Sequence, residues 1–275
     1  MGLLRRLYWR SPLRTWRVMS RTHHDLTADD VMLASYPRSG VLWLRFLLLH
    51  LLRDEVTLEA VAHQLPYIGE HRLAARLLPR GGRLMKTHEP YRKSYRRAVH
   101  LVRDPRDIVL SYFSFVRRAG RLTVGPRDDV SVAFDRFLDA FVKGHVDPFG
   151  PWPEHLQSWL GEAQRGDADV LLVRYEDLRA DPVGVLLRIA AWLGVAFDAG
   201  RAAGAVERSG LDRMRQSVMT ELARRADSPF RARGEALPLI NDGRVHGWLE
   251  RLDDRQLARF RPMAECLTSL GYPAP

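Results

Sequence analysis

The sequence predicts a protein of the α/β class, with a central parallel sheet flanked by helices. Short apolar runs at 31–34, 98–103 and 169–175 have the length and composition of buried strands. Helical segments follow the first two runs: a dense apolar stretch over 42–49, and a segment opened by Pro105. Because each helix that connects parallel strands covers a face of the sheet, this alternation favours a layered α/β domain.

Further elements follow from local signals. Residues 83–88 are expected to form one more short strand. Pro182 opens a helix that Gly194 ends, since proline suits the first turn of a helix and glycine suits the position after its end. The polar stretch 120–129 is expected to be a loop. The stretch 225–243, rich in Arg, Pro, Gly and Asp, is expected to be a long loop and a candidate lid.

Size and composition are those of a protein with a sizeable packed core. The chain has 275 residues, of which 46% are hydrophobic, enough for one large domain or two small ones. We expect a basic leader over 1–28 and a single domain over 29–275. Cys266 is the one cysteine of the chain, which excludes an internal disulfide and the usual cysteine-based zinc sites.

The charge of the chain points to an anionic partner. The formal net charge of +10 favours a polyanion or a highly charged small cofactor, and it also fits an arginine-rich genome. The positive residues are spread through the chain, which weakens the case for nucleic acid. The longest apolar run, over 42–52, is interrupted by Arg45 and His50 and is too short to cross a bilayer.

The leader is arginine-rich. Residues 1–21 contain six arginines but no uninterrupted apolar core of the kind found in signal peptides. We therefore expect a cytoplasmic protein and not a secreted one. The leader is either a loosely packed segment or an amphipathic helix in peripheral contact with a membrane.

The most informative segment is the polar loop 35–40, which lies between the apolar runs 31–34 and 42–49. A tight loop between a buried strand and a buried helix directs backbone N–H groups and the positive end of the helix dipole at one point. Arg38 adds a cation and Ser39 a hydroxyl group. This P-loop-like arrangement indicates an anion site with phosphate as the expected ligand, and an ordinary strand-to-helix turn is the alternative.

At four places the chain resembles the nucleotide-dependent sulfotransferases, which use 3′-phosphoadenosine 5′-phosphosulfate (PAPS). Tyr-Pro-Arg-Ser-Gly-Val-Leu-Trp at 36–43 resembles the loop that holds the 5′-phosphosulfate in that family. Leu-Val-Arg-Asp-Pro-Arg-Asp-Ile-Val-Leu-Ser-Tyr at 101–112 is similar to the family's 3′-phosphate motif. Lys-Thr-His at 86–88 resembles the segment with the catalytic histidine, and Arg-Tyr-Glu-Asp-Leu at 174–178 resembles the strand end near the adenine. The resemblance covers roughly residues 31–250.

The resemblance implies a sulfotransferase fold and the in-line transfer of a sulfuryl group from PAPS to a hydroxyl group. His88 would be the general base, while Lys86 and Arg38 would offset charge on the transferring sulfonate and the leaving phosphate. Residues two apart on a strand share a face, so Lys86 and His88 should point the same way. A sulfonate carries less charge than a phosphoryl group, so no metal is required. The implied donor contacts are Arg38, Ser39, Gly40, Val41, Leu42, Trp43, Arg103, Ser111, Tyr175, Ser209, Leu211, Gly243 and Arg244.

Three departures from the family pattern leave the strength of PAPS binding open. Arg38 stands where the family has lysine, which keeps the charge but changes its geometry. Val41 and Leu42 replace a threonine pair and so remove two hydroxyl donors. Asn-Asp at 241–242 stands where the family has an arginine and a lysine. The family's short dimerisation motif is not visible, so the oligomeric state also stays open.

Three other functions remain alternatives. A P-loop kinase or other phosphotransferase shares the strand–loop–helix start, although the Gly-x-x-x-x-Gly-Lys-Ser/Thr pattern is absent. The charge of +10 allows a non-enzymatic binder of nucleic acid or membrane. The change at Val41 and Leu42 keeps open a family member that binds PAPS, or its desulfonated product PAP, without activity. His88 itself has a structural alternative, and His145 and His155 are further candidates for the base.

The acceptor is expected to be a small hydroxylated molecule, whether phenolic, lipidic or another natural product. Variable loops should line its pocket, and a basic rim of Arg117, Arg118 and Arg121 would also suit an acidic glycan. The sequence does not identify the acceptor. The aromatic candidates for the pocket wall are Tyr67, Phe115, Phe134, Phe141, Phe149 and Trp152.

Overall fold

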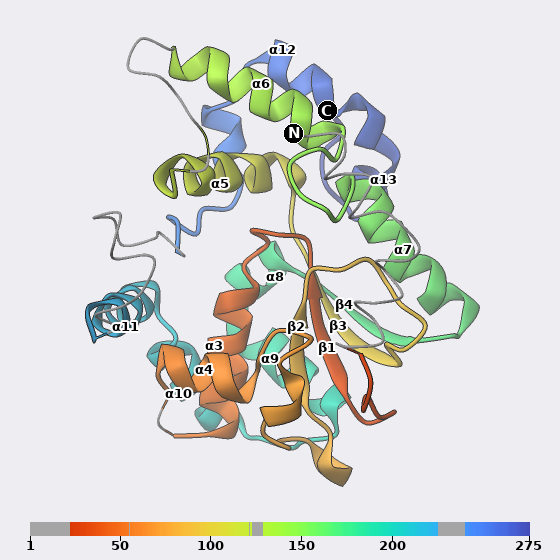
Figure 1. Ribbon diagram of the computed structural model, residues 1–275, viewed down its shortest axis with the longest axis vertical. Coiled ribbons are helices and arrows are strands. Elements are labelled where there is room, and N and C mark those ends of the chain that lie inside the picture. Colours follow the sequence, from red (N-terminus) through yellow and green to blue (C-terminus); the bar gives the residue numbers. More distant parts are fainter. Residues whose placement is uncertain (1–22, 55, 121, 123–128, 225–239) are drawn as a thin grey trace.

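A parallel sheet forms the centre of the computed structural model, which confirms the predicted α/β class (Figure 1). The strand order is β2-β1-β3-β4, and each neighbouring pair runs parallel. The structure describes residues 23–54, 56–120, 122, 129–224 and 240–275. Within them the strands are β1 (Val31–Ser35), β2 (Leu84–Thr87), β3 (Arg97–Val102) and β4 (Asp169–Arg174).

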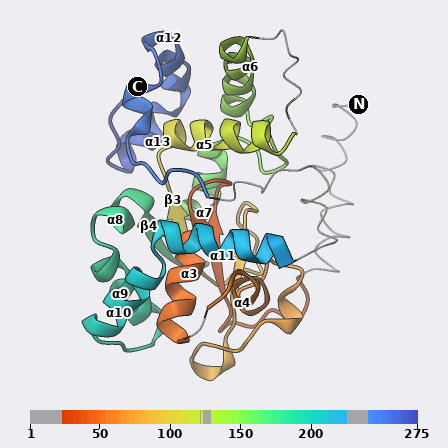
Figure 2. The ribbon, with the colours of Figure 1, turned by 90° about the vertical axis from the view of Figure 1, so that its left-hand side faces the viewer.

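Helices cover both faces of the sheet and the region beyond the carboxyl ends of its strands (Figure 1). The helix α11 packs against α4 and crosses in front of α3 in the view of Figure 2. The described α-helices are α3 (Val41–Leu52), α4 (Leu58–Gln64), α5 (Pro105–Arg118), α6 (Val130–Val142), α7 (Trp152–Arg165), α8 (Tyr175–Ala180), α9 (Pro182–Leu193), α10 (Ala199–Arg208), α11 (Leu211–Arg224), α12 (Asp254–Leu257) and α13 (Ala264–Ser269). Short 3-10 helices lie at His71–Leu73, Pro79–Gly81, Gly247–Glu250 and Ala258–Met263.

Alternate residues of the strands pack into two separate cores. Val31 and Leu33 of β1 belong to a core shared with α3, α9 and α10. Met32 and Ala34 point to the opposite face, where they share a core with Trp159 of α7. Side chains alternate along a strand, so a sheet covered on both faces needs apolar residues at every position. This is why the strands appear in the sequence as continuous apolar runs.

A third core lies beyond the carboxyl ends of the strands. It joins Ile108 of α5, Phe141 of α6 and Leu267 of α13 with Tyr36, which directly follows β1. The Tyr36 hydroxyl also donates a hydrogen bond to the carbonyl oxygen of Gly150 at 2.9 Å. The start of the loop after β1 is therefore fixed between the sheet and this helical layer.

The predicted helix boundaries are confirmed. Pro105 lies in the first turn of α5, where the Asp104 side chain caps the helix by accepting from a backbone N–H. Pro182 opens α9, and Gly194 ends it in a left-handed conformation with a φ of 79°.

The prediction of a buried strand over 169–175 is correct for the strand itself but wrong about its end and its burial. β4 ends at Arg174, because Tyr175 begins the helix α8. Most of its side chains are only partly buried. β4 is the edge strand of the sheet, so one flank of it has no neighbouring strand among the described residues.

The described part of the leader contacts the domain. Residues 1–22 lie outside the described residues, but His23 is buried and its Nε2 lies 3.0 Å from the Tyr95 hydroxyl. The carbonyl oxygen of Asp25 accepts a hydrogen bond from Arg83 at 2.6 Å. The chain is thus tied to the domain from His23 onward.

Two of the expected loops lie largely outside the described residues. Of the loop 120–129, the structure describes 120, 122 and 129, and of the candidate lid 225–243 it describes 240–243. Across the described ranges, no helix combines the length and the apolar composition needed to cross a membrane.

Candidate functional site

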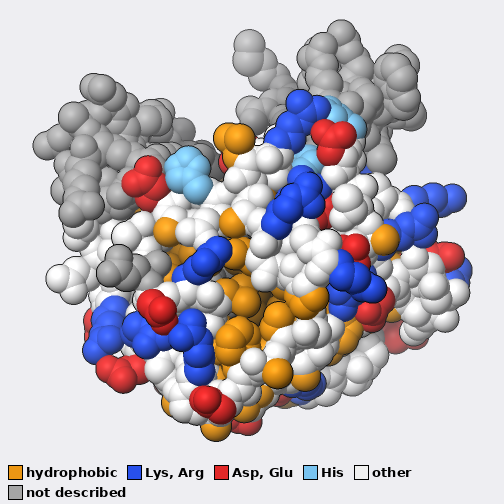
Figure 3. Space-filling view, turned by 90° about the horizontal axis from the view of Figure 1, so that it is seen from below, with side chains coloured by type: hydrophobic (Ala, Val, Ile, Leu, Met, Phe, Trp, Pro, Cys, Tyr) orange, Lys and Arg blue, Asp and Glu red, His pale blue; other side chains and the backbone are white. Residues whose placement is uncertain are grey.

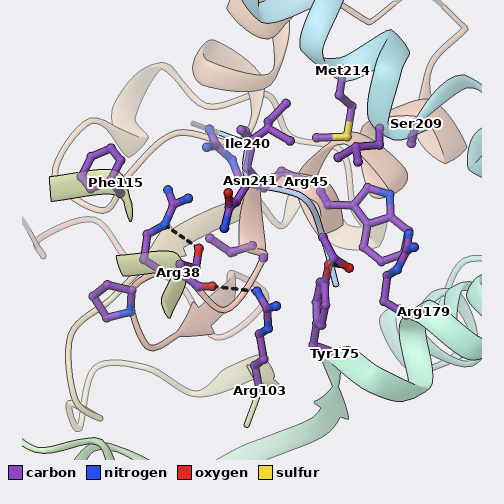
Figure 4. Close-up of a pocket in the computed structure, with 18 of the residues that line it drawn as sticks. Arg38, Arg45, Arg103, Phe115, Tyr175, Arg179, Ser209, Met214, Ile240 and Asn241 are labelled. Atoms are coloured by element: carbon purple, nitrogen blue, oxygen red, sulfur yellow. Dashed lines mark hydrogen bonds between the residues drawn. The ribbon is translucent and has the colours of Figure 1, made fainter. Parts of the chain in front are cut away.

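The carboxyl ends of all four strands open into one cavity. The loop 36–40 follows β1, His88 follows β2, Arg103 follows β3 and Tyr175 follows β4. In the strand order β2-β1-β3-β4, the chain passes from β1 to β2 on one side and then crosses to β3 on the other side. The ends of β1 and β3 therefore flank a switch point of the sheet, where ligands of α/β proteins bind. The cavity has a volume of about 540 Å³. The expected site residues that line it are Arg38, Gly40, Val41, Leu42, Trp43, Lys86, His88, Arg103, Ser111, Tyr175, Ser209, Leu211 and Gly243 (Figure 4).

Two of the expected site residues do not line the cavity. Ser39 lies directly behind its wall, buried, and its hydroxyl has no hydrogen-bond partner among the described residues. The Arg244 side chain turns away to Glu250 at 3.2 Å and to Asp242 at 3.6 Å. Its backbone carbonyl oxygen stays in the site, where it accepts a hydrogen bond from Arg103 Nη2 at 2.6 Å.

The loop before α3 has a backbone built for an anion. Gly40 has a φ of 97°, and a Cβ at this position would lie 2.6 Å from the ring of Tyr175, so glycine is required here. α3 begins directly after Gly40 without a side-chain cap and without an acidic residue in its first turn. The first N–H groups of a helix have no acceptor within the helix, so they remain available to a bound anion.

Arg38 and the motif after β3 meet in one crevice (Figure 4). Arg38 Nε donates to Ser111 Oγ at 3.3 Å, and Arg103 Nη1 donates to the carbonyl oxygen of Arg38 at 3.4 Å. Burial, and then the charge of Arg103, lower the pKa of Arg38 to about 10, which leaves it a cation at neutral pH. Two segments more than 60 residues apart therefore present their cations to the same space.

Acidic residues at the start of α5 hold this arrangement together. Asp104 forms a fully buried ion pair with Arg106 at 2.7 Å, and the Arg106 guanidinium lies 3.8 Å from the ring centroid of Trp248. Asp107 accepts hydrogen bonds from the backbone N–H groups of His246 at 2.9 Å and Trp248 at 3.1 Å. The C-terminal segment is thereby anchored beside Arg103.

An aromatic pair forms the wall on the other side of the crevice. The rings of Trp43 and Tyr175 meet edge to face, with their centroids 5.9 Å apart. Arg103 lies 4.4 Å from the Tyr175 ring centroid and Arg179 lies 5.3 Å from that of Trp43. The Tyr175 hydroxyl donates to the carbonyl oxygen of Gly243 at 3.2 Å. Such a wall offers a flat apolar surface for a base, with cations at its edges.

His88 is held in one tautomer. Its Nδ1 lies 2.7 Å from the carbonyl oxygen of Ser35. A carbonyl oxygen only accepts, so Nδ1 carries the hydrogen and Nε2 keeps its lone pair. Burial, and then the charge of Lys86, lower the pKa of His88 well below its usual range, so the imidazole is neutral at pH 7. A neutral imidazole with an unprotonated Nε2 is suited to accept a proton.

Lys86 lies in the same part of the cavity. Its ammonium group is 5.4 Å from the ring centroid of Tyr67. Burial, and then the charges of Arg45 and Arg38, lower the pKa of Lys86 to about 7. A bound anion would favour the charged form and raise this pKa again.

The sequence reasoning missed two cations of the cavity, Arg45 and Arg179. In the sequence, Arg45 stands out only as an interruption of the apolar stretch after the loop. An arginine inside an otherwise apolar helix is itself a signal, because a buried charge needs a partner or a ligand. Arg179 is brought to Trp43 by the turn of α8, which no local pattern predicts.

The aromatic candidates for the acceptor wall divide into two groups. Phe115 and Phe149 line the cavity, and the Tyr67 ring lies 6.2 Å from the ring of His88. The other three candidates pack in the third core, beyond the carboxyl ends of the strands: Phe134, Phe141 and Trp152. In the described ranges, no group of three or more His, Cys, Asp or Glu side chains is placed to hold a metal ion.

The chain is similar to known sulfotransferases. A family model described as sulfotransferase domain matches residues 28–268. Sulfotransferase 2B1 of Homo sapiens is 26% identical over 217 residues, which cover 74% of this chain and 56% of the relative. Flavonol 4′-sulfotransferase of Flaveria chlorifolia is 31% identical over 203 residues, which cover 66% of this chain and 60% of the relative. The matched part thus spans less than two thirds of these relatives' length.

Solved structures show the same fold. A mouse sulfotransferase complexed with PAP aligns with a TM-score of 0.62 at 21% identity, covering 92% of each chain. Retinol dehydratase in a complex with retinol and PAP aligns with a TM-score of 0.67 at 19% identity, covering 95% of this chain and 88% of the other. Because the family model matches most of the chain, the protein belongs to the sulfotransferase family, as its sequence motifs predicted.

Proposed function

We propose that this protein transfers a sulfuryl group from PAPS to a hydroxyl group of a small-molecule acceptor. The observation that carries the proposal is the meeting of Arg38, Arg103 and Ser111 in one crevice, between His88 and an aromatic wall. PAPS carries about four negative charges at its two ends, counting the usual ionisation of phosphate. A single crevice with cations from two distant segments suits a donor of this kind.

The proposed donor contacts divide the crevice into three parts. The 5′-phosphosulfate lies against the loop 36–40 and the first turn of α3, the 3′-phosphate lies at Arg103 and Ser111, and the adenine lies against Trp43 and Tyr175. Further contacts come from Ser39, Val41, Leu42, Ser209, Leu211, Gly243 and the backbone of Arg244.

Unused hydrogen-bond donors support this assignment. Ser209 Oγ and Arg103 Nε are buried, have no hydrogen-bond partner among the described residues, and belong to residues that line the cavity. A buried donor without a partner is unfavourable, so these groups fit a site completed by an anionic ligand. Ser39 Oγ is also buried without a partner among the described residues, but Ser39 lies outside the cavity lining.

The proposed mechanism uses His88 as the base. His88 Nε2 takes the proton from the acceptor hydroxyl while its oxygen attacks the sulfur of PAPS. The bond between sulfur and the 5′-phosphate oxygen breaks on the opposite side, and PAP leaves. Lys86 and Arg38 offset the charge on the transferring sulfonate and on the leaving phosphate. In this proposal His88 accepts the proton and Lys86 and Arg38 supply the positive charge, so the mechanism includes no metal ion.

The whole chain is proposed to function as one domain over 29–275 with a basic leader over 1–28. A cytoplasmic location and a peripheral membrane contact of the leader stay predictions.

On the face shown in Figure 3, Lys and Arg side chains lie in several small groups with acidic side chains among them. A face of this kind does not offer the continuous basic patch that nucleic acid requires.

Calorimetric titration with PAP, with ATP and Mg²⁺, and with duplex DNA tests the donor class. We expect tight binding of PAP, weaker binding of the ATP complex and no saturable binding of DNA. Preference for the ATP complex would favour the P-loop phosphotransferase instead.

Transfer itself is tested with ³⁵S-labelled PAPS and a panel of phenols and alcohols. Formation of a labelled product would support the proposed sulfotransferase activity. PAP binding without transfer to any acceptor would support the alternative of an inactive nucleotide-binding family member, which the missing hydroxyl groups at Val41 and Leu42 favour.

A further inference from the structure

We propose that the acceptor is a phenolic carboxylate, whose carboxylate group is bound by Arg45 while its hydroxyl group faces His88. This inference rests on the proposed sulfuryl transfer and names its substrate class. It depends on Arg45, whose charge no motif of the nucleotide site uses.

Arg45 is a buried cation with an unused donor. Its side chain lies in the cavity wall, and only 8% of the residue is exposed. Nη2 donates to the carbonyl oxygen of Val61 in α4 at 2.8 Å. Nε is buried without a hydrogen-bond partner among the described residues. Burying a guanidinium with an unused N–H is unfavourable, and an anion in the cavity would remove the penalty.

Arg45 lies apart from Arg103 in the cavity (Figure 4), and its Nη2 donates to Val61 of α4. Burial is the largest cause of the lowered pKa of Lys86 and of His88, and the charge of Arg45 contributes to both. A cation that acts on both of these groups lies near the atoms that exchange the proton and the sulfonate.

The charges of the cavity leave Arg45 in excess of what the donor needs. Five Lys and Arg side chains line the cavity, and no aspartate or glutamate is among its lining residues; Glu70, outside the lining, favours the charged form of Arg45. PAPS brings about four negative charges. These match four of the cations, namely Arg38, Lys86, Arg103 and Arg179. A second anion, carried by the acceptor, would match Arg45.

The walls near His88 favour an aromatic acceptor. The rings of Phe149 and Tyr67 lie 5.9 Å and 6.2 Å from the His88 ring, and Leu58 and Phe115 also line the cavity. The lowered pKa of His88 makes it a weak base. A phenol, with a pKa of about 10, gives up its proton far more easily than an alkyl alcohol. A ring that bears both a hydroxyl and a carboxylate group meets all of these conditions.

The test compares a phenolic acid with its uncharged ester. The acceptors are 3-(4-hydroxyphenyl)propionate and its methyl ester, used with labelled PAPS, and the variants are Arg45→Gln and Arg45→Lys. We expect the wild type to prefer the acid, and Arg45→Gln to lower kcat/KM for the acid by about 10- to 100-fold, the effect of losing a charged hydrogen bond. The ester should lose much less activity than the acid in Arg45→Gln, so that the acid-to-ester ratio of kcat/KM falls, and Arg45→Lys should restore part of the ratio.

Arg179→Gln is the matched control. It removes another cavity cation, on the side of Trp43, so it should weaken PAP binding and leave the acid-to-ester ratio unchanged. Arg45→Gln should lower the acid-to-ester ratio and leave PAP affinity unchanged. The unchanged PAP affinity would also show that this variant is folded.

Several outcomes would overturn the inference. Equal use of acid and ester by the wild type, or no transfer to the acid, would refute it even if no variant folds. A loss of PAP affinity in Arg45→Gln with an unchanged acid-to-ester ratio would assign Arg45 to the donor. In each of these cases PAP binding and transfer to the ester would leave the proposed function standing, whereas a wild type that fails to bind PAP would refute the proposed function itself.

Discussion

At the scale of single residues, one backbone carbonyl decides which nitrogen of His88 is a base. The hydrogen bond from Nδ1 to Ser35 places the proton on that nitrogen, so Nε2 is the atom with the free lone pair. The depressed pKa of His88 keeps the ring neutral at neutral pH. The residue is ready to accept a proton before any substrate arrives.

His88→Ala is expected to lower kcat by about 10²- to 10⁴-fold, the usual contribution of a general base, and to leave PAP affinity within about twofold. The wild-type kcat/KM should fall only in acid, as the pH drops through the lowered pKa of His88 and the ring gains a proton. Steady-state rates and PAP titrations measure both effects. His145→Ala, which changes an exposed histidine outside the cavity wall, is the control. Transfer at a near-wild-type rate in His88→Ala would remove it as the base.

Lys86 is expected to make binding of the proposed donor depend on pH. Burial, and then the charges of Arg45 and Arg38, lower its pKa to about 7, and a bound anion would raise it, so binding above pH 7 would require the uptake of a proton. PAP affinity should therefore decrease as the pH rises from 7 to 9, by at most about tenfold per pH unit. Titrations at several pH values check this decrease. In Lys86→Met the affinity should be lower at pH 6 and flat up to pH 9, and an unchanged slope would assign the titration to another group.

At the scale of elements, the turn from β1 into α3 depends on one glycine. Gly40 combines a φ of 97° with a contact to Tyr175 that leaves no room for a Cβ. The same turn supplies the N-terminus of α3 to the cavity. Backbone conformation, the aromatic wall and the anion site therefore depend on each other at this position.

Gly40→Ala and Gly166→Ala separate backbone strain from the contact with Tyr175. Gly166 has a φ of 78° but nothing within 4 Å of an added Cβ. Both variants should lose about 1–2 kcal/mol of stability from the left-handed backbone. Gly40→Ala alone should also displace Tyr175 and weaken PAP binding by more than about tenfold, because a shift of the aromatic wall disturbs the nucleotide contacts. Thermal unfolding and PAP titration measure these effects, and equal PAP affinities of the two variants would contradict the argument.

At the scale of the whole molecule, the sequence predicts what local patterns determine. Apolar runs, Pro105, Pro182 and Gly194 determine the strands and helix ends, and the structure agrees with them except at the end and the burial of β4. The motifs predict which residues meet at the carboxyl ends of the strands, since parallel strands all end at the same edge of a sheet.

The sequence does not predict contacts that depend on packing between distant elements. Arg45 reaches the cavity because α3 packs on α4, and the Arg244 side chain leaves it because Asp242 and Glu250 offer closer partners. Phe134 and Phe141 look like candidates for a pocket wall, but helix α6 buries them in the third core. Such outcomes follow from the three-dimensional arrangement; the apolar surroundings of Arg45 signal a buried charge, but not which cavity it lines.

The central claim is that two cationic motifs hold opposite ends of one nucleotide. It is tested most directly by titrating the wild type, Arg38→Met and Arg103→Met with PAP and with adenosine 5′-phosphate, which lacks the 3′-phosphate. The wild type should bind PAP at least about tenfold more tightly than adenosine 5′-phosphate, as a charged hydrogen bond to the 3′-phosphate requires. Arg103→Met should abolish this difference, and Arg38→Met should weaken both ligands and preserve it. A wild type that binds the two nucleotides equally, or an Arg103→Met variant that still distinguishes them, would contradict the account.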